Sequence, residues 1–277
     1  MRLPVQFATK PIVFAQVVTN NEASAVVTRL RNISTEQFQL RIQEQESGDG
    51  KHAPESVAWM AIEEGVNSTG LPFEVSKKLV SSNPVALSLA QSYTTPGFVT
   101  CLQTFNENNP VAVRYSGLTG SSATIYCQEE TSLDPETNHG YESAGYLALE
   151  AGQALTLADG EAFGETGQIS VSDAALTVNL EYDYHNPVVI LGGISNNDGA
   201  PATIRVTSVT ANSFTVKIDE WDYLDGTHGT ESLSYLVIEG SLPFDREVEC
   251  SAIPDPPVLG VDIVGMDNCD VSTAITV

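Results

Sequence analysis

The sequence predicts an all-β protein made of tandem antiparallel β-sandwich modules, and three observations support this. Only 17% of the residues are charged, while Thr, Ser, Asn and Val are abundant, a composition that favours strands over helices. Apolar and polar side chains alternate with a period of two in many segments, as in half-buried strands. One unit also occurs three times, and such repetition is typical of modular arrays.

The repeated unit is clearest at residues 220–239, EWDYLDGTHGTESLSYLVIE. Related segments are EQESGDGKHAPESVAWMAIE at 44–63 and EETSLDPETNHGYESAGYLALE at 129–150. Each has acidic residues, a turn, a histidine, a glutamate three positions later, and a hydrophobic strand that ends in Glu. The histidines are 87 and 89 residues apart, so each unit has the size of a small domain.

The first and third copies align without a gap at an offset of 176 residues, which places Arg29 on Arg205 and His52 on His228. The middle copy keeps His139 and the Glu142-Ser143 pair, and its segment NENNPVAVRYSGLTG reads as an insertion. We therefore divide the chain into residues 1–65, 66–153 and 154–242 as three β-sandwich repeats, and 243–277 as the start of a different repeat.

The first repeat lacks the lead-in strand that the third has in GQISVSDAALTVNLEYDYHN, so we expect it to be truncated and the chain to be part of something longer. The start of the chain superficially resembles a signal peptide. However, its segment PIVFAQVVTNN has a counterpart inside the chain, PVVILGGISNN, and is therefore expected to belong to the fold.

The elements of the first repeat follow from alternation and turn residues. We expect short strands on either side of Pro11, because proline suits a strand start or edge. Strands at 23–33 and 38–42 then flank the turn NISTEQ, and the turn at 48–50 precedes a last strand from Ser56. Antiparallel strands at this spacing indicate a β-sandwich.

The second repeat contains six strand-like segments, and the third, from about 154 to 240, repeats the pattern without cysteine. The six segments are PFEVSKKLV (72–80), NPVALSLAQ (83–91), GFVTCLQTF (97–105), AVRYSG (112–117), ATIYCQEE (123–130) and AGYLALEAG (144–152).

The net charge of the chain limits the classes of binding partner that we expect. There are 36 acidic and 12 basic side chains, a formal net charge of −24. Such a surface repels phosphate backbones and anionic lipid, so we expect neither nucleic acid nor membrane insertion, and no stretch of about 20 apolar residues is present. Divalent cations are more plausible partners.

The four cysteines form two local pairs. Cys101 and Cys127 are predicted to lie on an antiparallel strand pair and to form a cross-strand disulfide, with Cys250 and Cys269 as a second pair. Disulfides indicate an oxidising, secreted or cell-surface location. Zinc binding is the alternative, but neither pair has short ligand spacing or a nearby histidine.

Two resemblances can be named. The PxV strand, the pairs RLRNI/FQLRI and RVTSV/FTVKI, and the closing strands VAWMAIEEG and SYLVIEG resemble the H-type lectin domain. That resemblance implies a six-stranded sandwich that binds N-acetylgalactosamine and related sugars, commonly as a homotrimer. The tail CSAIPDPPVLGVDIVGMDNCD resembles the start of the HYR-like, immunoglobulin-type repeats of long secreted adhesins of gliding, polysaccharide-degrading bacteria.

The repeated hairpin holds the candidate site, with two interpretations. Its polar side chains bond the turn backbone and fix the hairpin; alternatively, carboxylates, imidazole and aromatic rings form a shallow glycan pocket. The candidate ligand-binding residues are Asp49, His52 and Glu55, then Asp134, His139, Tyr141 and Glu142, then Glu220, Trp221, Asp222, Tyr223, Asp225, His228 and Glu231.

Calcium is a possible ligand of the same loops, because Asp225 and Glu231 supply hard oxygen atoms, although the spacing is not that of an EF-hand. Arg29 and Arg205 are expected to form cross-strand ion pairs with nearby carboxylates. Trp59, Tyr146 and Tyr235, at equivalent positions of the last strand, are expected in the core or at a subunit interface.

The sequence thus predicts a non-enzymatic, multivalent carbohydrate-binding or adhesive region of a secreted or cell-surface protein. No nucleophile elbow, phosphate loop or HExxH pattern occurs, and three copies favour avidity over catalysis. The alternatives are a structural stalk without a ligand and an accessory binding region of a polysaccharide-degrading enzyme.

Overall fold

The computed structural model describes residues 1–68, 71–157, 160–240, 262–266 and 273–276. All regular secondary-structure elements in these ranges are β-strands, and nearly all of the strand pairs are antiparallel. The predicted all-β class is confirmed. In the described part of the chain, no helix is long and apolar enough to cross a bilayer.

The second module is a two-sheet sandwich. Its inner sheet has the order β5 (Gly65–Asn67), β6 (Phe73–Val80), β11 (Glu142–Glu150) and β8 (Pro96–Leu102). Its outer sheet contains β9 (Val111–Thr119), β10 (Ser122–Glu129) and β7 (Val85–Ser88). Apolar side chains of both sheets share one buried cluster, so the two sheets pack face to face.

The third module repeats this arrangement. Its inner sheet is β12 (Ala154–Thr156), β13 (Ala162–Val171), β19 (Glu231–Glu239) and β15 (Pro187–Leu191), and its outer sheet is β14 (Leu176–Asn179), β18 (Ser213–Glu220) and β17 (Ala202–Thr210). The short β16 (Ile194–Ser195) leaves this module and pairs in parallel with β9 of the second. The two modules therefore share a hydrogen-bonded sheet edge.

The first module has fewer strands of its own. β1 (Ile12–Val17) pairs with β4 (Val57–Ile62), and β2 (Val27–Arg31) pairs with β3 (Gln39–Gln43). Two strands of the tail, β20 (Asp262–Met266) and β21 (Thr273–Thr276), extend its inner sheet in the order β1-β4-β20-β21. They take the places of β6 and β5 in the second module, so the tail strands that are described join the first module's sheet.

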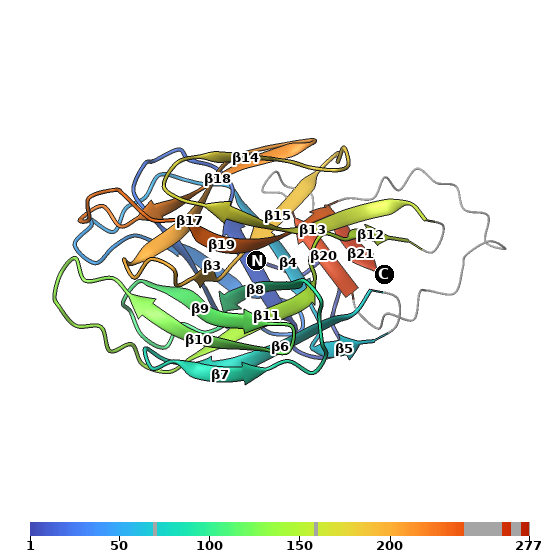
Figure 1. Ribbon diagram of the computed structural model, residues 1–277, viewed down its shortest axis with the longest axis horizontal. Helices are drawn as coiled ribbons and strands as arrows, with labels where there is room; N and C mark the ends of the chain where they lie inside the picture. The colour runs from blue at the N-terminus through green and yellow to red at the C-terminus, as the bar shows by residue number, and fades with distance from the viewer. Residues whose placement is uncertain (69–70, 158–159, 241–261, 267–272, 277) are drawn as a thin grey trace.

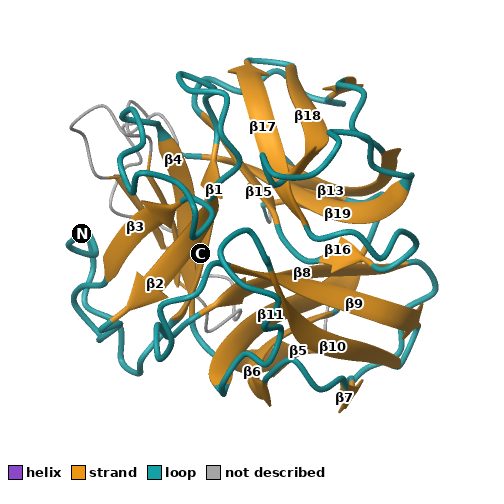
Figure 2. Cartoon of the chain, turned by 90° about the vertical axis from the view of Figure 1, so that its left-hand side faces the viewer, coloured by secondary structure: helices purple, strands orange, loops and turns teal. Residues whose placement is uncertain are grey.

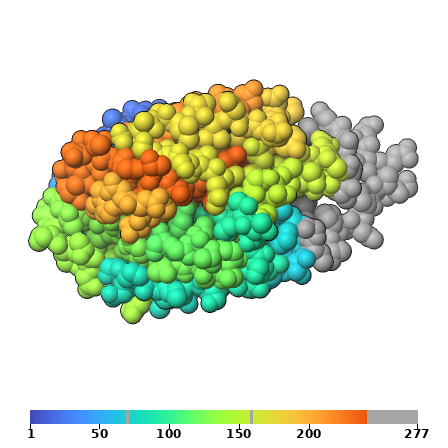
Figure 3. All heavy atoms as spheres, in the orientation of Figure 1, coloured from blue at the N-terminus to red at the C-terminus, as the bar shows by residue number. Residues whose placement is uncertain are grey.

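The three inner sheets meet at the centre of the molecule. Figure 2 shows three groups of strands around a common middle, and Figure 3 shows the third module, yellow to orange, packed on the second, green to teal. β1 and β4 are buried along their whole length. The first module's core continues into Val99 and Leu147 of the second and Ile190 and Leu236 of the third. The inner sheets are therefore buried on both faces, which explains their unbroken apolar runs.

Backbones approach closely near this centre. The Thr100 N–H donates to the Gly192 carbonyl of the next module at 3.3 Å, and a Cβ atom on Gly192 would lie 2.2 Å from the Thr100 oxygen. A cavity of about 80 Å³ lies there, lined by matching strands of all three modules. The chain order and the long axis of the molecule are seen in Figure 1.

The predicted disulfide between Cys101 and Cys127 is absent, because both residues are buried free cysteines. Cys101 lies on β8 of the inner sheet and packs in the central core, whereas Cys127 lies on β10 of the outer sheet and packs inside the sandwich. Burial raises the pKa of both thiols, to about 11 and about 12. Cys250 and Cys269 lie outside the described residues.

Candidate functional site

Three glutamates mark the boundaries between modules. Glu142 and Glu231 are the first residues of β11 and β19, and Glu55 lies two residues before β4. None of the three side chains has solvent-accessible surface. Because an isolated buried carboxylate is very unfavourable, its partners decide what such a site does.

Each carboxylate is first held by its own module. Glu231 accepts hydrogen bonds from the Ser195 hydroxyl and from the backbone N–H groups of Asn197 at 2.9 Å and Asp198 at 3.0 Å. Hydroxyl and backbone groups at equivalent positions do the same for the other two carboxylates. They are Thr104, Asn106 and Glu107 for Glu142, and Thr19, Asn21 and Glu22 for Glu55.

Each carboxylate also pairs with a fully buried arginine of a different module. The pairs are Arg29 of the first module with Glu142 of the second (2.9 Å), Arg114 of the second with Glu231 of the third (2.7 Å), and Arg205 of the third with Glu55 of the first (2.9 Å). Each module gives an arginine to one neighbour and a glutamate to the other. The three ion pairs therefore close a ring.

The arginines reach further into the neighbouring module. Arg29 also donates to the carbonyl oxygens of Glu107 at 3.1 Å and Asn109 at 2.7 Å. Arg114 and Arg205 donate to the equivalent carbonyls of Asp198 and Glu22. A guanidinium that bonds carboxylate and backbone together fixes both the distance and the orientation of the two modules.

A histidine bridges two carboxylates within each module. His228 Nδ1 lies 3.3 Å from Glu220 and Nε2 lies 3.3 Å from Glu231. The His52 ring nitrogens lie 3.0 Å from Glu44 and 3.2 Å from Glu55, and those of His139 lie 3.3 Å from Glu129 and 3.5 Å from Glu142. The two carboxylates at each ring hold the imidazole in one orientation.

The ring of three Arg–Glu pairs between modules is called the inter-module lock below. The pKa shifts of its residues agree with charged side chains. Burial lowers the pKa of Arg29 to about 10, which still leaves it protonated. Burial alone would raise the pKa of Glu142, but hydrogen bonds from His139, Thr104 and Asn106 lower it below 4.5. Glu231 shows the same balance. The pKa of His228 is raised above 6.5, because bonds to Glu231 and Glu220 outweigh burial.

The structure divides the predicted ligand-binding residues into two groups. His139, Glu142, Trp221, His228 and Glu231 are at most 1% exposed and face protein partners, and Glu55 and Glu220 are also buried. Asp49, Asp134, Tyr141, Asp222 and Asp225 are exposed, while His52 and Tyr223 are partly buried. The repeated His and Glu positions thus lie inside the molecule.

The exposed aspartates hold turns and loop contacts. Asp49, Asp134 and Asp225 each accept a hydrogen bond from the backbone N–H two residues later. Such bonds are typical of Asx turns, as in the turn-bonding interpretation. Asp222 accepts from Ala25 N–H of the first module, and the Tyr223 hydroxyl contacts Thr131 of the second. The loop between β18 and β19 therefore contacts both neighbouring modules. The predicted hairpin is wrong: β18 lies in the outer sheet and β19 in the inner sheet, so the loop crosses between sheets instead of joining two paired strands.

Asp225 and Glu231, the predicted calcium pair, have different protein partners. Glu231 is buried against Arg114 and His228, whereas the exposed Asp225 caps its own turn. Among the described residues, the one group of three side chains with metal-ligand geometry is Glu22, Glu44 and His52.

Sequence reasoning missed the role of the arginines. Arg29 and Arg205 were expected to pair within their own sheet, yet each reaches another module, and Arg114 was not predicted at all. It lies in the segment read as an insertion, but an offset of 85 residues joins Arg29 to Arg114 and Thr19 to Thr104. The extra residues of the middle copy lie instead between Glu129 and His139, which are ten apart rather than eight.

Comparison with known proteins gives one informative similarity. The chain is 24% identical over 262 residues to Halomucin of Haloquadratum walsbyi (strain DSM 16790 / HBSQ001). The match covers 87% of this chain but only 3% of Halomucin, so the chain spans a small part of that protein's length. No protein-family profile and no solved structure matches the chain.

The ring of ion pairs predicts a large cost for removing one carboxylate. We expect Glu142→Gln to lower the free energy of unfolding by about 3–5 kcal/mol, because the buried Arg29 guanidinium loses its counter-charge. Urea unfolding followed by circular dichroism measures this. The exposed Glu36→Gln is the control and should change stability by no more than about 0.5 kcal/mol. Equal effects of the two substitutions would refute the lock.

His228 and the two carboxylates that it bridges, Glu220 and Glu231, should stabilise the fold most within a limited range of pH. The Glu231 pKa is below 4.5, so its contribution is present above that pH and is lost as the pH falls through the folded pKa. The His228 pKa is above 6.5, so its contribution is complete below that pH and is lost as the pH rises through the folded pKa. The cluster should stabilise most between about pH 4.5 and 6.5.

This pH dependence is measured as the difference in unfolding free energy between the wild type and His228→Gln. The difference should shrink toward alkaline pH, where the imidazolium between Glu220 and Glu231 loses its proton. A difference that stays constant across pH would show that His228 is neutral in the fold.

Proposed function

We propose that this chain is a non-enzymatic structural and adhesive unit of a large extracytoplasmic protein, in which three β-sandwich modules act as one rigid body. The observation that carries this proposal is the ring of buried Arg–Glu pairs. The His and Glu residues that occur in all three copies, and that resemble a binding or catalytic site in the sequence, help to hold the modules together.

The similarity to Halomucin supports the proposal in two ways. It extends over most of this chain but a small fraction of the relative, as expected for one unit of a much longer protein. The name of that relative describes a mucin, which suits a location outside the cytoplasm. The net charge of −24 also suits a soluble, mutually repelling surface.

The rigid-body proposal is tested by asking whether the modules unfold together. Trp59 is buried in the first module and Trp221 in the third, so Trp221→Phe and Trp59→Phe each leave one fluorescent reporter. We expect both reporters and the circular dichroism of each variant to give coincident denaturant transitions. Separate transitions would mean independent modules, as in a flexible string of domains.

Carbohydrate binding is the second candidate, favoured by the exposed loop at residues 131–141. Tyr141 is 65% exposed and Leu133 is 66% exposed on this loop, although large apolar side chains are usually covered. A tyrosine ring can cover the apolar face of a sugar, while Asp134, an exposed carboxylate of the same loop, can accept hydrogen bonds from hydroxyl groups. For this candidate function, the glycan contacts the surface of the loop at residues 131–141, and the buried histidines hold the loop in place.

A glycan array probed with the wild type and with Tyr141→Ala, with and without calcium, tests this candidate. We expect binding that Tyr141→Ala abolishes while circular dichroism stays unchanged. Tyr182→Ala, a partly buried tyrosine of the third module far along the chain, is the matched control. Absence of signal on every glycan would leave the structural unit as the function.

A further inference from the structure

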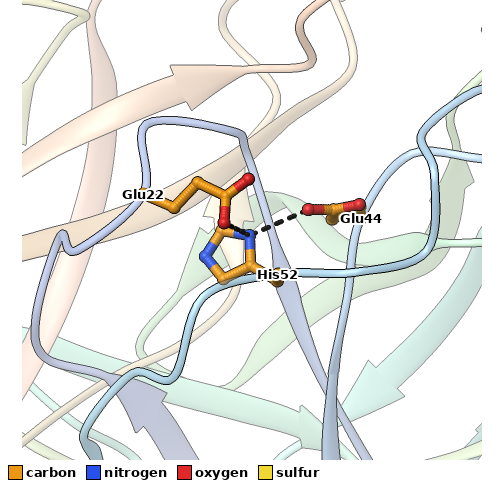
Figure 4. Close-up of side chains that lie close together, drawn as sticks. All are labelled: Glu22, Glu44 and His52. Atoms are coloured by element: carbon orange, nitrogen blue, oxygen red, sulfur yellow. Dashed lines mark hydrogen bonds and ion pairs between the residues drawn. The ribbon is translucent and has the colours of Figure 1, made fainter.

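The first module contains a group of three side chains, none of which belongs to an Arg–Glu pair of the inter-module lock. Glu22 comes from the loop after β1, Glu44 follows β3, and His52 lies in the loop before β4. Figure 4 shows the two carboxylates close to the ring of His52. His52 Nδ1 lies 3.0 Å from Glu44 Oε1 and 3.9 Å from Glu22 Oε2, and all three ligand atoms lie within 4.8 Å of one another.

The opposite ring nitrogen is already oriented. His52 Nε2 lies 3.2 Å from Glu55, whose side chain is fully buried and is fixed by Thr19, Asn21 and Arg205. A carboxylate behind a histidine is the usual arrangement at metal sites, because it holds the ring and its tautomer so that the other nitrogen can bind the ion. Glu55 therefore presents Nδ1 to Glu44 and Glu22.

The local charge favours a divalent ion. Glu22, Glu44 and Glu55 bring three negative charges, and the Arg205 guanidinium neutralises one of them. A divalent cation between Glu22 and Glu44 neutralises the other two.

The site is also reachable from solvent. A pocket of about 320 Å³ between the first and second modules is lined by Glu44, His52, Glu46 and Leu133. Glu46 Oε2 is buried and has no hydrogen-bond partner among the described residues, and Glu22 is 36% exposed. The equivalent histidines, His139 and His228, have no exposed side-chain surface. The first module alone thus combines the ligands with an opening.

We propose that Glu22, Glu44 and His52 bind one Zn²⁺ ion in the first module. One imidazole nitrogen and two carboxylate oxygens are ligand types that zinc accepts, with a solvent molecule as the remaining ligand. Calcium and magnesium prefer an all-oxygen set, so the histidine selects against them. The bound ion ties the loop after β1 to the loop before β4, and so stabilises the module that has the fewest strands of its own.

Calorimetric titration of the metal-free full chain with Zn²⁺ tests the site, at about 0.5 M NaCl so that loose binding to the acidic surface is screened. We expect one Zn²⁺ per chain and a rise in the thermal unfolding temperature that Ca²⁺ and Mg²⁺ do not produce. Equivalent binding of Ca²⁺, or no saturable uptake of Zn²⁺, would overturn the assignment.

Three substitutions separate the site from general folding. Glu22→Gln, which changes a partly exposed side chain outside the ion-pair ring, should weaken Zn²⁺ binding about 10-fold or more. His52→Gln should abolish the saturable binding. His185→Gln, at a histidine whose side chain is 80% exposed, should leave it unchanged. If Glu22→Gln folds normally and binds Zn²⁺ like the wild type, the proposed ligand set is wrong.

Discussion

The structure depends on a buried arginine that crosses each module boundary to a buried glutamate. Each such charge would be very unfavourable alone, so the loss of the partner of Arg29, Arg114 or Arg205 should strongly destabilise the contact between modules. The pairs join the first module to the second, the second to the third and the third to the first. If one pair is lost, all three modules are therefore still connected through the other two pairs. A closed cycle makes one unit of three similar domains.

The apolar centre and the polar ring have different tasks. The inner sheets bury large, similar apolar faces against one another, and this burial supplies most of the driving force without defining an orientation. The guanidinium groups and their carbonyl and carboxylate acceptors define it, since they bind only when the strands meet in one register. We infer that the hydrophobic core holds the modules together and the ion pairs select their arrangement.

This division changes the meaning of the repeated His-x-x-Glu pattern. Three copies of a polar constellation suggest three ligand sites, yet Glu142 and Glu231 are saturated by hydroxyl, amide, imidazole and guanidinium donors. Repetition here reflects three equivalent boundaries. Ligand contact is left to groups outside the lock, the exposed Tyr141 loop and the Glu22, Glu44 and His52 group. Both lie in loops next to residues of the ion-pair ring.

The sequence by itself determined the strands, the turns and the number of copies, because alternation, Asp-Gly turns and equal spacing are local properties of the chain. It also identified His52, His139 and His228 as equivalent. It placed Trp59, Tyr146 and Tyr235 in the core or at an interface, and of these Trp59 and Tyr146 are buried and Tyr235 is partly buried. Only the tertiary structure decided that Arg29 leaves its own sheet for Glu142, that Cys101 and Cys127 lie in different cores, and that the tail strands extend the first module's sheet. These outcomes depend on which apolar faces meet, and that choice is made by packing between segments more than 100 residues apart, for which a local pattern carries no signal.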